Sequence, residues 1–237
     1  MEISVIIPTL NEEENIEKLL VHLKDCLKNV SHEIIVSDAK SSDATPSIVN
    51  SVDSVQLLQC EKMSRAHQMN KGAALAKGKI LYFVHADSIP PASFYEDILQ
   101  AFNEGFQLGC YRFKLDSDSL MLAINSYFTR FDRIMCRGGD QTLFIRKTDF
   151  EALNGFNDSF RIMEEYDFIL RARKQLKFKI IPKDVLVSAR KYEENSYLRV
   201  NFANLVVFTL FRLGSSQERM IKAYRTLLNH PKAEGLA

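Results

Sequence analysis

The chain has 237 residues, enough for one large α/β domain with an appended segment and a substantial buried core. Lysine and arginine total 31 against 30 for aspartate and glutamate, so the formal net charge is +1 and a general nucleic-acid binder is not expected. Its cysteines, Cys26, Cys60, Cys110 and Cys136, lack CxxC spacing, which indicates reduced, mostly buried thiols in a cytoplasmic protein. The start, MEISVIIPTL, carries an acid and no base, and it predicts a first strand rather than an export signal.

Strands and helices are expected to alternate over the first 90 residues. The β-branched run at 3–10 has the length of a buried strand, and residues 11–27 form an amphipathic helix with Asn11 as candidate cap. This alternation predicts a parallel sheet with right-handed crossovers. The other elements expected here are strands at 32–40, 54–60 and 79–87 and helices within 41–52 and 64–78.

The pattern beyond residue 90 is less regular. Apolar spacing predicts helices at 91–105, 119–135 and 164–175. Strands are expected at 109–115 and 141–147, and an extended pair at 177–190. The sequence therefore predicts one α/β domain over residues 1–195, followed by a helical extension over residues 196–237.

The extension contains a very apolar segment, residues 197–214, and then an amphipathic helix. A bilayer span needs about 20 predominantly apolar residues, and polar side chains at Arg199, Asn201, Asn204 and Arg212 interrupt this segment, so it is not expected to span. Three interpretations stay open: helices that cap the domain, helices that pair in a homodimer, and helices that lie on a membrane surface.

Two polar residues stand where open α/β sheets bind ligands, at the carboxyl ends of the strands. Asp38 closes the second strand and could accept hydrogen bonds from a base or ribose, or it could simply shape a turn. Arg65 begins the third helix, where its guanidinium could pair with phosphate oxygens. An ordinary solvated arginine is the alternative.

The strand at 79–87 is apolar until it ends in His85, Ala86 and Asp87. Hard divalent cations use one or two protein carboxylates and complete their shell with water and substrate phosphates. Asp87 is therefore a candidate ligand for Mg²⁺ or Mn²⁺. His85 lies two residues earlier on the same strand face, where it could ligate, support the site or pack as an ordinary histidine.

Two further motifs carry polar groups next to predicted elements. GGDQ at 138–141 joins two glycines, which permit close backbone approach, to Asp140 and Gln141, although an ordinary turn would also explain it. MEEYDF at 163–168 places Glu164, Glu165 and Asp167 near a helix start. Acids stabilise a helix dipole there, and one of the three could act as a general base.

Six motifs occur in the order found in one known family. Together they resemble family 2 glycosyltransferases, and within these a bacterial subgroup whose metal motif reads HAD in place of DxD. The resemblance covers roughly residues 3–228. It implies a GT-A fold, a nucleotide-diphosphate sugar donor, Mg²⁺ or Mn²⁺, and inversion by direct displacement. The motifs are IIPTLNEE at 6–13, SDAKSSDAT at 37–45, RAHQMNKGA at 65–73, HAD at 85–87, GDQ at 139–141 and MEEYDF at 163–168.

The resemblance assigns nine residues to the donor. Those in the first strand and its loop would line the nucleoside pocket, and Asp38 would contact the base. Arg65 and Asn70 would approach the ribose or pyrophosphate, while Arg190 could hold the diphosphate from the far side. The set is Pro8, Thr9, Asn11, Glu13, Asp38, Arg65, Asn70, His85 and Arg190.

The remaining roles implied by the resemblance concern metal, acceptor and base. Asp87 would bind the metal, and Asp140 and Gln141 would face the acceptor or the donor sugar. The general base of the family is the Asp of an ED pair, and alignment puts Glu165 at that position, one methylene longer.

The chain departs from the family at other positions. Asp167 could substitute as the base, with Glu164 the third acid of the cluster. Lys40 stands where members carry small residues, and Tyr192 where the subgroup often has Trp.

The expected activity is inverting transfer of a sugar from a nucleotide-diphosphate donor, UDP-linked by preference, to a small-molecule or lipid-linked hydroxyl acceptor. The expected location is the cytoplasm, with membrane-surface contact through the extension as one option. A catalytically silent GT-A module that binds nucleotide or a protein partner is the alternative, favoured by the departures at Lys40, His85 and Glu165. A nucleotidyltransferase would need a basic, glycine-rich loop after the first strand, where NEEEN is acidic.

Overall fold

The structure, a computed structural model, describes residues 1–228. Its centre is β1 (Ile3–Thr9), which is buried along its whole length and pairs in parallel with β2 on one side and β4 on the other. A strand buried on both faces needs apolar side chains on both, which explains the continuous run ISVII. The other strands are β2 (His32–Asp38), β3 (Val55–Gln59), β4 (Ile80–Phe83), β5 (Ser88–Ile89), β6 (Leu108–Leu115), β7 (Leu143–Arg146) and β8 (Phe178–Val187).

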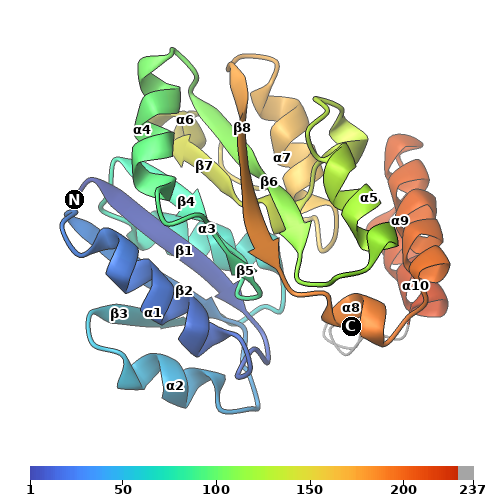
Figure 1. The fold of residues 1–237 in the computed structure, drawn as a ribbon, viewed down its shortest axis with the longest axis horizontal. Helices are drawn as coiled ribbons and strands as arrows, with labels where there is room; N and C mark the ends of the chain where they lie inside the picture. The colour runs from blue at the N-terminus through green and yellow to red at the C-terminus, as the bar shows by residue number, and fades with distance from the viewer. Residues whose placement is uncertain (229–237) are drawn as a thin grey trace.

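Within residues 1–228 these strands form one eight-stranded sheet in the order β3-β2-β1-β4-β7-β6-β8-β5. Among the described strands, β7 and β5 run antiparallel to their neighbours and the rest run together, so the sheet is mostly parallel, as predicted. The sheet is twisted and flanked by helices on both faces (Figure 1).

Alternate residues of the strands face two separate layers of helices. Ile3, Val5 and Ile7 pack in a core with helices α1, α2, α4 and α5, whereas Ile6 packs in the opposite core with α3, α6 and α7. Each fully buried aliphatic side chain contributes about 1.5–3 kcal/mol, so both layers are well anchored. The helices are α1 (Ile16–Leu27), α2 (Thr45–Ser51), α3 (Arg65–Leu75), α4 (Phe94–Asn103), α5 (Leu120–Phe128), α6 (Lys147–Ala152), α7 (Glu164–Ala172), α8 (Arg190–Glu193), α9 (Tyr197–Arg212) and α10 (Gln217–Leu227), with 3-10 turns η1 (Ile134–Cys136) and η2 (Gly139–Gln141).

Several predicted boundaries were wrong in the first half of the chain. The helix expected from residue 11 begins at Ile16, and Asn11 does not cap it but has a left-handed φ of 54°. Asparagine tolerates this conformation better than most residues. The strand expected at 79–87 leaves the ladder after Phe83, and the carbonyl of Asp87 accepts a hydrogen bond from the backbone N–H of Ser188 at 3.0 Å.

The second half contains further differences from prediction. The extended pair expected at 177–190 is the single strand β8, whose register against β6 shifts at Pro182, a residue that cannot donate to a ladder. The helix expected to reach residue 135 ends at Phe128, because buried Arg137 gathers the following chain by donating to the carbonyls of Thr129 and Phe131. The short helix α6 was not predicted.

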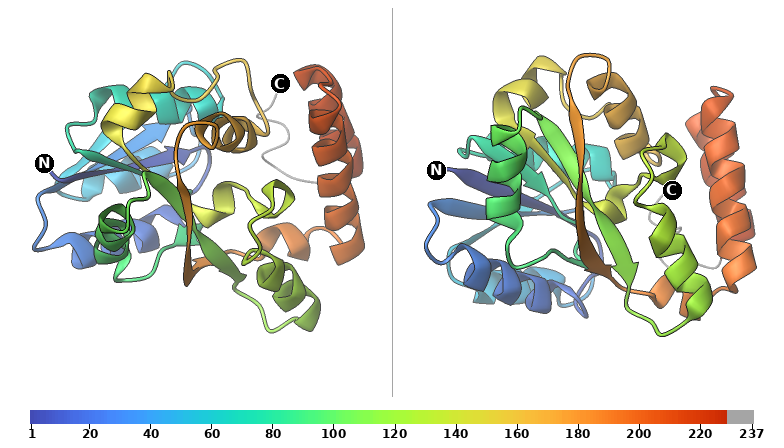
Figure 2. Two further views of the ribbon diagram at one scale, coloured as in Figure 1. Left: turned by 90° about the horizontal axis from the view of Figure 1, so that it is seen from above. Right: turned by 45° about the horizontal axis from the view of Figure 1, so that its top comes forward.

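Helices α9 and α10 form a hairpin at the end of the molecule opposite the N-terminus (Figure 2). Val207, Met220 and Ile221 pack against Ile162, in the segment that leads into α7. The carboxamide of Gln217 accepts the backbone N–H of Ile162 at 3.2 Å. In residues 1–228 no helix has the length and apolarity that crossing a bilayer requires. The extension therefore packs on the domain, while the last nine residues of the predicted extension lie outside the described part of the chain.

Candidate active site

The carboxyl ends of β1 and β2 meet through a buried hydrogen bond. Thr9 and Asp38 are register partners in the parallel ladder, and the Thr9 hydroxyl donates to Asp38 Oδ1 at 2.9 Å. Ser41 adds its backbone N–H, 2.9 Å from Asp38 Oδ2. Asp38 is fully buried, so its carboxylate organises this sheet edge as well as standing where a ligand was predicted. Pro8 precedes it on β1 and is buried.

Two loops, residues 10–15 and 39–45, are joined side by side at this edge, and we call them the paired loops. The backbone N–H of Asn11 donates to Ser41 Oγ at 2.8 Å, and Asn11 Oδ1 accepts the N–H of Ser42 at 2.9 Å. Glu13 closes the other end, because its carboxylate accepts the N–H of Ala44 at 2.8 Å. The predicted nucleoside-pocket residues Asn11 and Glu13 are thus brought together with Asp38.

Helix α3 packs beneath the paired loops through Gln68, a residue that was not predicted from the sequence. Gln68 is 3% exposed, and its amide donates to the carbonyls of Thr9 at 2.8 Å and Ser37 at 2.6 Å. Asn70 lies further along α3, where its amide bonds the backbone of Phe156 and the carboxylate of Asp158. Gln68 therefore fixes the strand ends, and Asn70 is occupied by the 156–158 segment.

Two acidic residues at the start of α7 are buried, and each contacts a basic side chain. Glu164 is fully buried with its Oε1 2.6 Å from Arg65 Nε, and Glu165 is 5% exposed with its Oε1 3.0 Å from His85 Nε2. Arg65 at the start of α3 and His85 after β4 therefore converge on α7. We call these four residues the charged cluster.

The charges in this cluster shift each other's pKa values. Burial and the neighbouring Glu165 raise the pKa of Glu164, although Arg65 opposes the shift. Burial alone would raise the pKa of Glu165. The hydrogen bond from His85 and the charge of Arg65 outweigh burial, so the pKa of Glu165 is lowered. Burial disfavours the imidazolium of His85, yet the bond and charge of Glu165 raise its pKa. The arrangement favours an ionised Glu165 held by a protonated His85.

Gly139 lies directly against this pair. A Cβ atom at residue 139 would clash with the His85 ring and with Glu165 Oε1, so any side chain there would force the turn or one of these groups to move. The neighbouring Gly138 is different, since a Cβ there would only approach Tyr166 Oη at 3.6 Å. The GGDQ turn thus packs its backbone on the charged cluster, and the expected approach of this backbone to a ligand stays a prediction.

Asp87 and Asp140 supply the candidate metal donors. Desolvation and the nearby charge of Asp87 raise the pKa of Asp140, as expected when two carboxylates share one space. Among residues 1–228 no group of three or more His, Cys, Asp or Glu side chains is arranged to hold a metal ion. Carboxylate oxygens fit Mg²⁺ or Mn²⁺, which take one or two from the protein. This donor set therefore fits the predicted ion.

Helix α8 brings two cations close to Asp87 and Asp140. Arg190 lies 3.4 Å from the buried carboxylate of Glu12 and 3.2 Å from that of Glu14. Burial opposes its charge, but Glu12 and Asp87 raise the pKa of Arg190. Lys191 was not predicted; burial lowers its pKa, and Tyr224 and Asp140 more than reverse this. The only sequence signal for Lys191 was its position directly after Arg190, as a second cation.

Two predicted residues point away from the charged cluster. Asp167 pairs with Arg171 at 2.9 Å, and Arg171 also donates to the carbonyls of Leu153 and Gly155. Gln141 is 1% exposed and lies beside Cys110, and its Nε2 has no hydrogen-bond partner among the described residues. Neither arrangement brings the side chain to the His85–Glu165 pair.

Backbone strain gathers around the site. Four non-glycine residues with left-handed φ values adjoin predicted site residues: Asn11 at 54°, Lys40 at 62°, Thr142 at 58° and Met163 at 67°. Such conformations cost on the order of 1–3 kcal/mol each and cluster at functional sites. Met163 directly precedes Glu164, so the strain helps to set the direction in which α7 starts.

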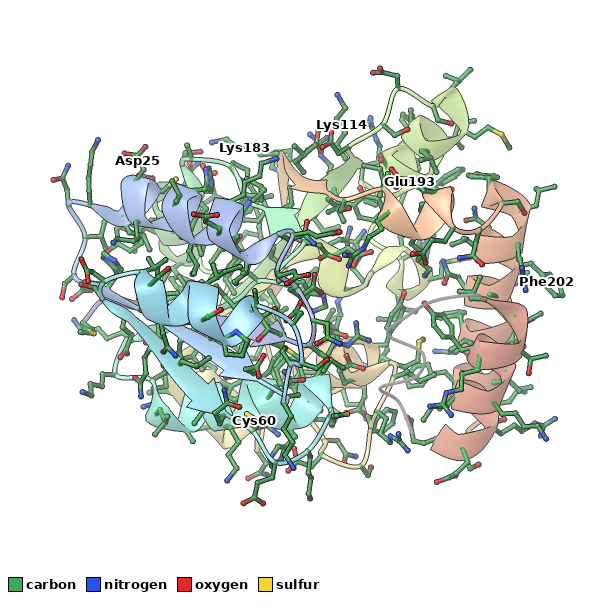
Figure 3. All side chains as sticks on the ribbon, turned by 90° about the horizontal axis from the view of Figure 1, so that it is seen from below. Asp25, Cys60, Lys114, Lys183, Glu193 and Phe202 are labelled. Atoms are coloured by element: carbon green, nitrogen blue, oxygen red, sulfur yellow. The ribbon has the colours of Figure 1, made fainter. Side chains whose placement is uncertain are left out.

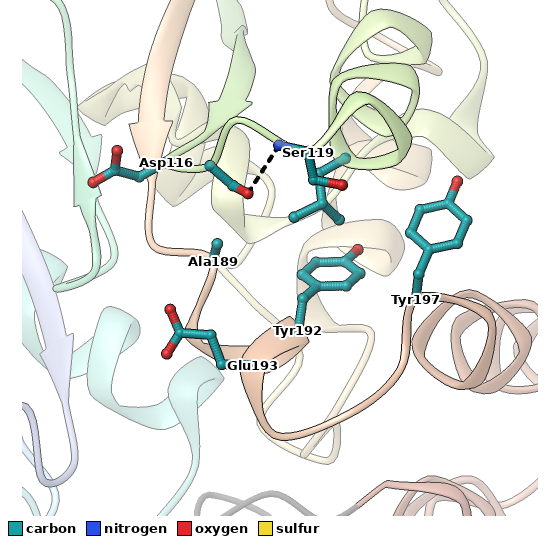
Figure 4. A pocket seen from close by; sticks show the side chains of 8 residues that line it. Asp116, Ser119, Ala189, Tyr192, Glu193 and Tyr197 are labelled. Carbon is teal, nitrogen blue, oxygen red and sulfur yellow. Dashed lines mark hydrogen bonds between the residues drawn. The ribbon is translucent and has the colours of Figure 1, made fainter.

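A hollow of about 230 Å³ lies on the other side of α8. Figure 4 shows Tyr192 and Glu193 of α8 facing Ser119 and Asp116 across it, with Tyr197 at the start of α9. The two tyrosine rings stack with centroids 6.3 Å apart. The hollow thus combines aromatic faces with carboxylates and hydroxyls next to the candidate active site.

The sheet order, the two helix layers and the acidic edge define the GT-A class of fold, that of nucleotide-diphosphate sugar transferases. Residues 4–153 match the family described as "Glycosyl transferase family 2", and the chain belongs to this family. The predicted family is thereby confirmed, whereas the HAD subgroup stays a prediction.

Solved structures agree with this fold. The S. aureus TarS domain in complex with UDP-GlcNAc superposes with a TM-score of 0.67 at 17% identity, covering 96% of this chain and 71% of that one. The mannosyltransferase PcManGT of Pyrobaculum calidifontis, in complex with GDP-Man and Mn²⁺, gives 0.65 at 20% identity, covering 95% and 69%. At 17% and 20% identity, these superpositions show a shared fold.

Sequence relatives match a shorter region. A dolichol-phosphate mannosyltransferase of Pyrococcus furiosus is 28% identical over 109 residues, which are 44% of this chain and 31% of the relative. A dolichyl-linked diacetamido-dideoxy-glucuronosyltransferase of Methanococcus voltae is 26% identical over 107 residues, 42% of this chain and 33% of the relative. These alignments span about a third of each relative's length.

Proposed function

We propose that this protein is an inverting glycosyltransferase that moves a sugar from a nucleotide-diphosphate donor to a hydroxyl group of a lipid-linked acceptor. The observation that carries the proposal is the convergence of an ionised, oriented Glu165 with Asp87 and Asp140 at the carboxyl edge of the sheet. That edge is where open α/β sheets bind ligands.

In this proposal Glu165 removes the proton of the acceptor hydroxyl. The hydroxyl oxygen forms a bond to the anomeric carbon as the bond from that carbon to the diphosphate breaks, and the configuration inverts. A general base of this kind contributes about 10²–10⁴-fold to a rate. His85 orients the carboxylate and keeps it ionised, and Gly139 allows backbone to approach both side chains.

The leaving diphosphate has candidate partners of its own. A Mg²⁺ or Mn²⁺ ion bound at Asp87, with Asp140 nearby, would neutralise the developing charge. Arg190 and Lys191 on α8 lie on the same side as these two acids, and Arg65 faces them from α3. Solved relatives that contain Mn²⁺ together with UDP or GDP-Man support this reading.

The donor is proposed to be UDP-linked. Pro8, Thr9 and Asp38 end the strands that lead into the paired loops, and Asn11 and Glu13 lie within these loops, which supports the proposed nucleoside pocket. The structural neighbours with UDP or UDP-GlcNAc bound favour uridine, and the one with GDP-Man is the reason to include guanosine in any test.

The lipid-linked acceptor is supported by the two sequence relatives, both named for dolichol-linked substrates. Such an acceptor would place the enzyme in the cytoplasm at the inner membrane face. A small acceptor bound in the hollow beside α8 is the competing proposal, because the hollow is lined by Tyr192, Tyr197 and carboxylates.

Donor turnover tests the proposal. With Mn²⁺ and no acceptor, the wild type should slowly hydrolyse UDP-GlcNAc or a related donor, and release of UDP can be followed by a coupled assay. Asp87→Ala should abolish this release. Turnover that is equal in both proteins, or that does not depend on metal, would overturn the assignment.

A catalytically silent nucleotide-binding module is a second candidate. It is favoured by the internal pairing of the charges, since Arg65, His85 and Arg190 each already face a protein carboxylate. Tight UDP binding without turnover of any UDP- or GDP-linked donor would select this candidate.

A further inference from the structure

Large apolar side chains are exposed mainly in two segments of the described chain. Fifteen such residues are exposed within residues 1–228, and seven of these lie in residues 120–135 and four in residues 198–213. On α5 and the following loop they are Leu120, Met121, Ile124, Tyr127, Phe128, Phe131 and Met135, and on α9 and its end they are Leu198, Phe202, Leu205 and Leu213. We call this set the apolar face.

The two segments belong to one end of the molecule. The Asn125 amide of α5 donates to Asn201 Oδ1 of α9 at 3.2 Å, and Tyr197 donates back to Asn125 Oδ1 at 2.9 Å. The polar contacts are thus turned inward between the helices. Figure 3 shows Phe202 pointing away from the body of the molecule.

The charge around the apolar face is positive although the whole chain carries only +1. Residues 119–136 and 196–214 contain four arginines, Arg130, Arg133, Arg199 and Arg212, all exposed, and the single acid Asp132, which is ion-paired with Arg173. Helix α10 adds three cations against one acid. The segments just before α5 and α9 contain four exposed acids, Asp116, Asp118, Glu193 and Glu194, of which Asp116 and Glu193 line the hollow of Figure 4.

We propose that the apolar face docks on the interfacial region of a bilayer containing anionic lipid. Helices that lie at this depth combine exposed Leu and Phe with Arg or Lys at the rim, and anionic lipid attracts such cations. A second copy fits less well, because a two-fold dimer brings the same patch against itself and would oppose the arginines of both copies.

Docking this way would serve the proposed function, on which the acceptor part of this inference rests. The outer side of helix α9 carries part of the apolar face. On its inner side, Val207 packs against Ile162, and the ring centroids of Phe208 and Tyr166 lie 5.9 Å apart. Tyr166 directly follows Glu165. Helix α9 therefore lies between the proposed membrane surface and the segment that carries Glu165, so docking would hold this segment one helix diameter, about 10 Å, from the interface.

Vesicle flotation tests the docking surface. The probes are vesicles of phosphatidylcholine alone and vesicles with added phosphatidylglycerol. The wild type should float with the anionic vesicles, and a triple variant of α9, Leu198→Gln, Phe202→Gln and Leu205→Gln, should bind about tenfold or more weakly. A triple variant of α5, Leu120→Gln, Ile124→Gln and Phe128→Gln, should behave in the same way.

A matched control removes equally exposed apolar side chains elsewhere. Val21→Gln, Met63→Gln and Leu75→Gln change residues that are 60%, 43% and 43% exposed and lie outside the apolar face. This variant should bind vesicles like the wild type. Arg133→Gln and Arg212→Gln should each weaken binding to anionic vesicles about fivefold while leaving neutral vesicles unaffected.

Two results would overturn the inference. One is a folded wild type that floats with neither vesicle, and the other is a dimer by light scattering that the α5 or α9 variant converts to monomer, since a second copy would then cover the face. UDP binding is measured on the same proteins. Lost UDP binding with retained flotation counts against the proposed function alone, and the reverse result counts against the docking surface alone.

Discussion

The paired loops and the charged cluster occupy the same sheet edge but are held by different interactions. In the paired loops, small polar side chains bond backbone amides: the Ser41 hydroxyl accepts the N–H of Asn11, and the Asn11 side chain accepts the N–H of Ser42. In the charged cluster, Arg65 and His85 meet Glu164 and Glu165. Hydrogen bonds to backbone amides, including those that the carboxylates of Glu13 and Asp38 accept, fix a shape, whereas ion pairs between side chains can exchange partners with a charged substrate. We therefore expect substitutions in the cluster to affect turnover and substitutions in the loops to affect stability.

The largest effect is expected at the proposed base. Glu165→Gln keeps the volume but cannot take a proton, so transfer should fall about 1000-fold while UDP affinity stays near the wild-type value. Asp167→Asn is the control, because Asp167 pairs with Arg171 away from the cluster. A larger loss in Asp167→Asn than in Glu165→Gln would transfer the role to Asp167.

A smaller loss of activity is expected at Gly139, and its neighbour Gly138 provides a close comparison. Gly139→Ala places a methyl group 2.2 Å from His85 Cε1, so the turn or the His85–Glu165 pair must move. A displacement of about 1 Å costs about 100-fold in rate. Gly138→Ala meets Tyr166 at an ordinary 3.6 Å and should retain most activity. Equal activity in the two variants would show that the turn is not packed as described.

The strand ends that carry the paired loops should respond in stability. Thr9→Val removes the buried hydroxyl that donates to Asp38, and the lost bond should cost about 1–3 kcal/mol in the free energy of unfolding. Urea denaturation measures this. Thr209→Val is the comparison, since Thr209 is exposed and bonds only within its own helix turn. A Thr9→Val protein as stable as Thr209→Val would remove the distinction between loops and cluster.

The smallest effect is a change in pH dependence. Burial raises the folded-state pKa of Glu164, so the folded protein holds this proton more tightly than the unfolded chain does. The contribution of Glu164 to the free energy of unfolding is therefore fully present below the ordinary carboxyl pKa of about 4.3, and it is lost as pH rises through the raised pKa of about 8. Glutamine does not titrate, so Glu164→Gln does not lose stability through this residue as pH rises.

Denaturation at several pH values measures the difference. The stability of Glu164→Gln relative to wild type should increase between pH 5 and pH 8, by on the order of 1 kcal/mol. Glu17→Gln, a change at an exposed carboxylate on α1, should follow the wild-type curve. Parallel curves for all three proteins would contradict the raised pKa.

The parallel part of the fold was predictable because its signal is local. Buried strands such as Ile3–Thr9 read as β-branched runs, and α1 shows its apolar positions at helical spacing. The errors fall where tertiary contacts decide. Asn11 leaves the predicted helix because Ser41 and Ser42 bind it, and α5 stops where Arg137 collects the next carbonyls.

The site was predictable as a set of motifs but not as a set of partners. Sequence order singled out Asp87, Asp140 and Glu165, and the structure brings them near one another at the sheet edge, while their roles stay predictions. It gave no means to pair His85 with Glu165 across 80 residues, or to find Gln68 beneath Thr9. Such pairings depend on packing that no local pattern encodes.

Calorimetric titration of UDP into the wild type and Asp87→Ala, each with and without Mn²⁺, tests the central claim most directly, with GDP as the comparison nucleotide. The account predicts that tight UDP binding needs both Mn²⁺ and Asp87. UDP binding that is unchanged without the metal or without Asp87, or no binding at all, would contradict it.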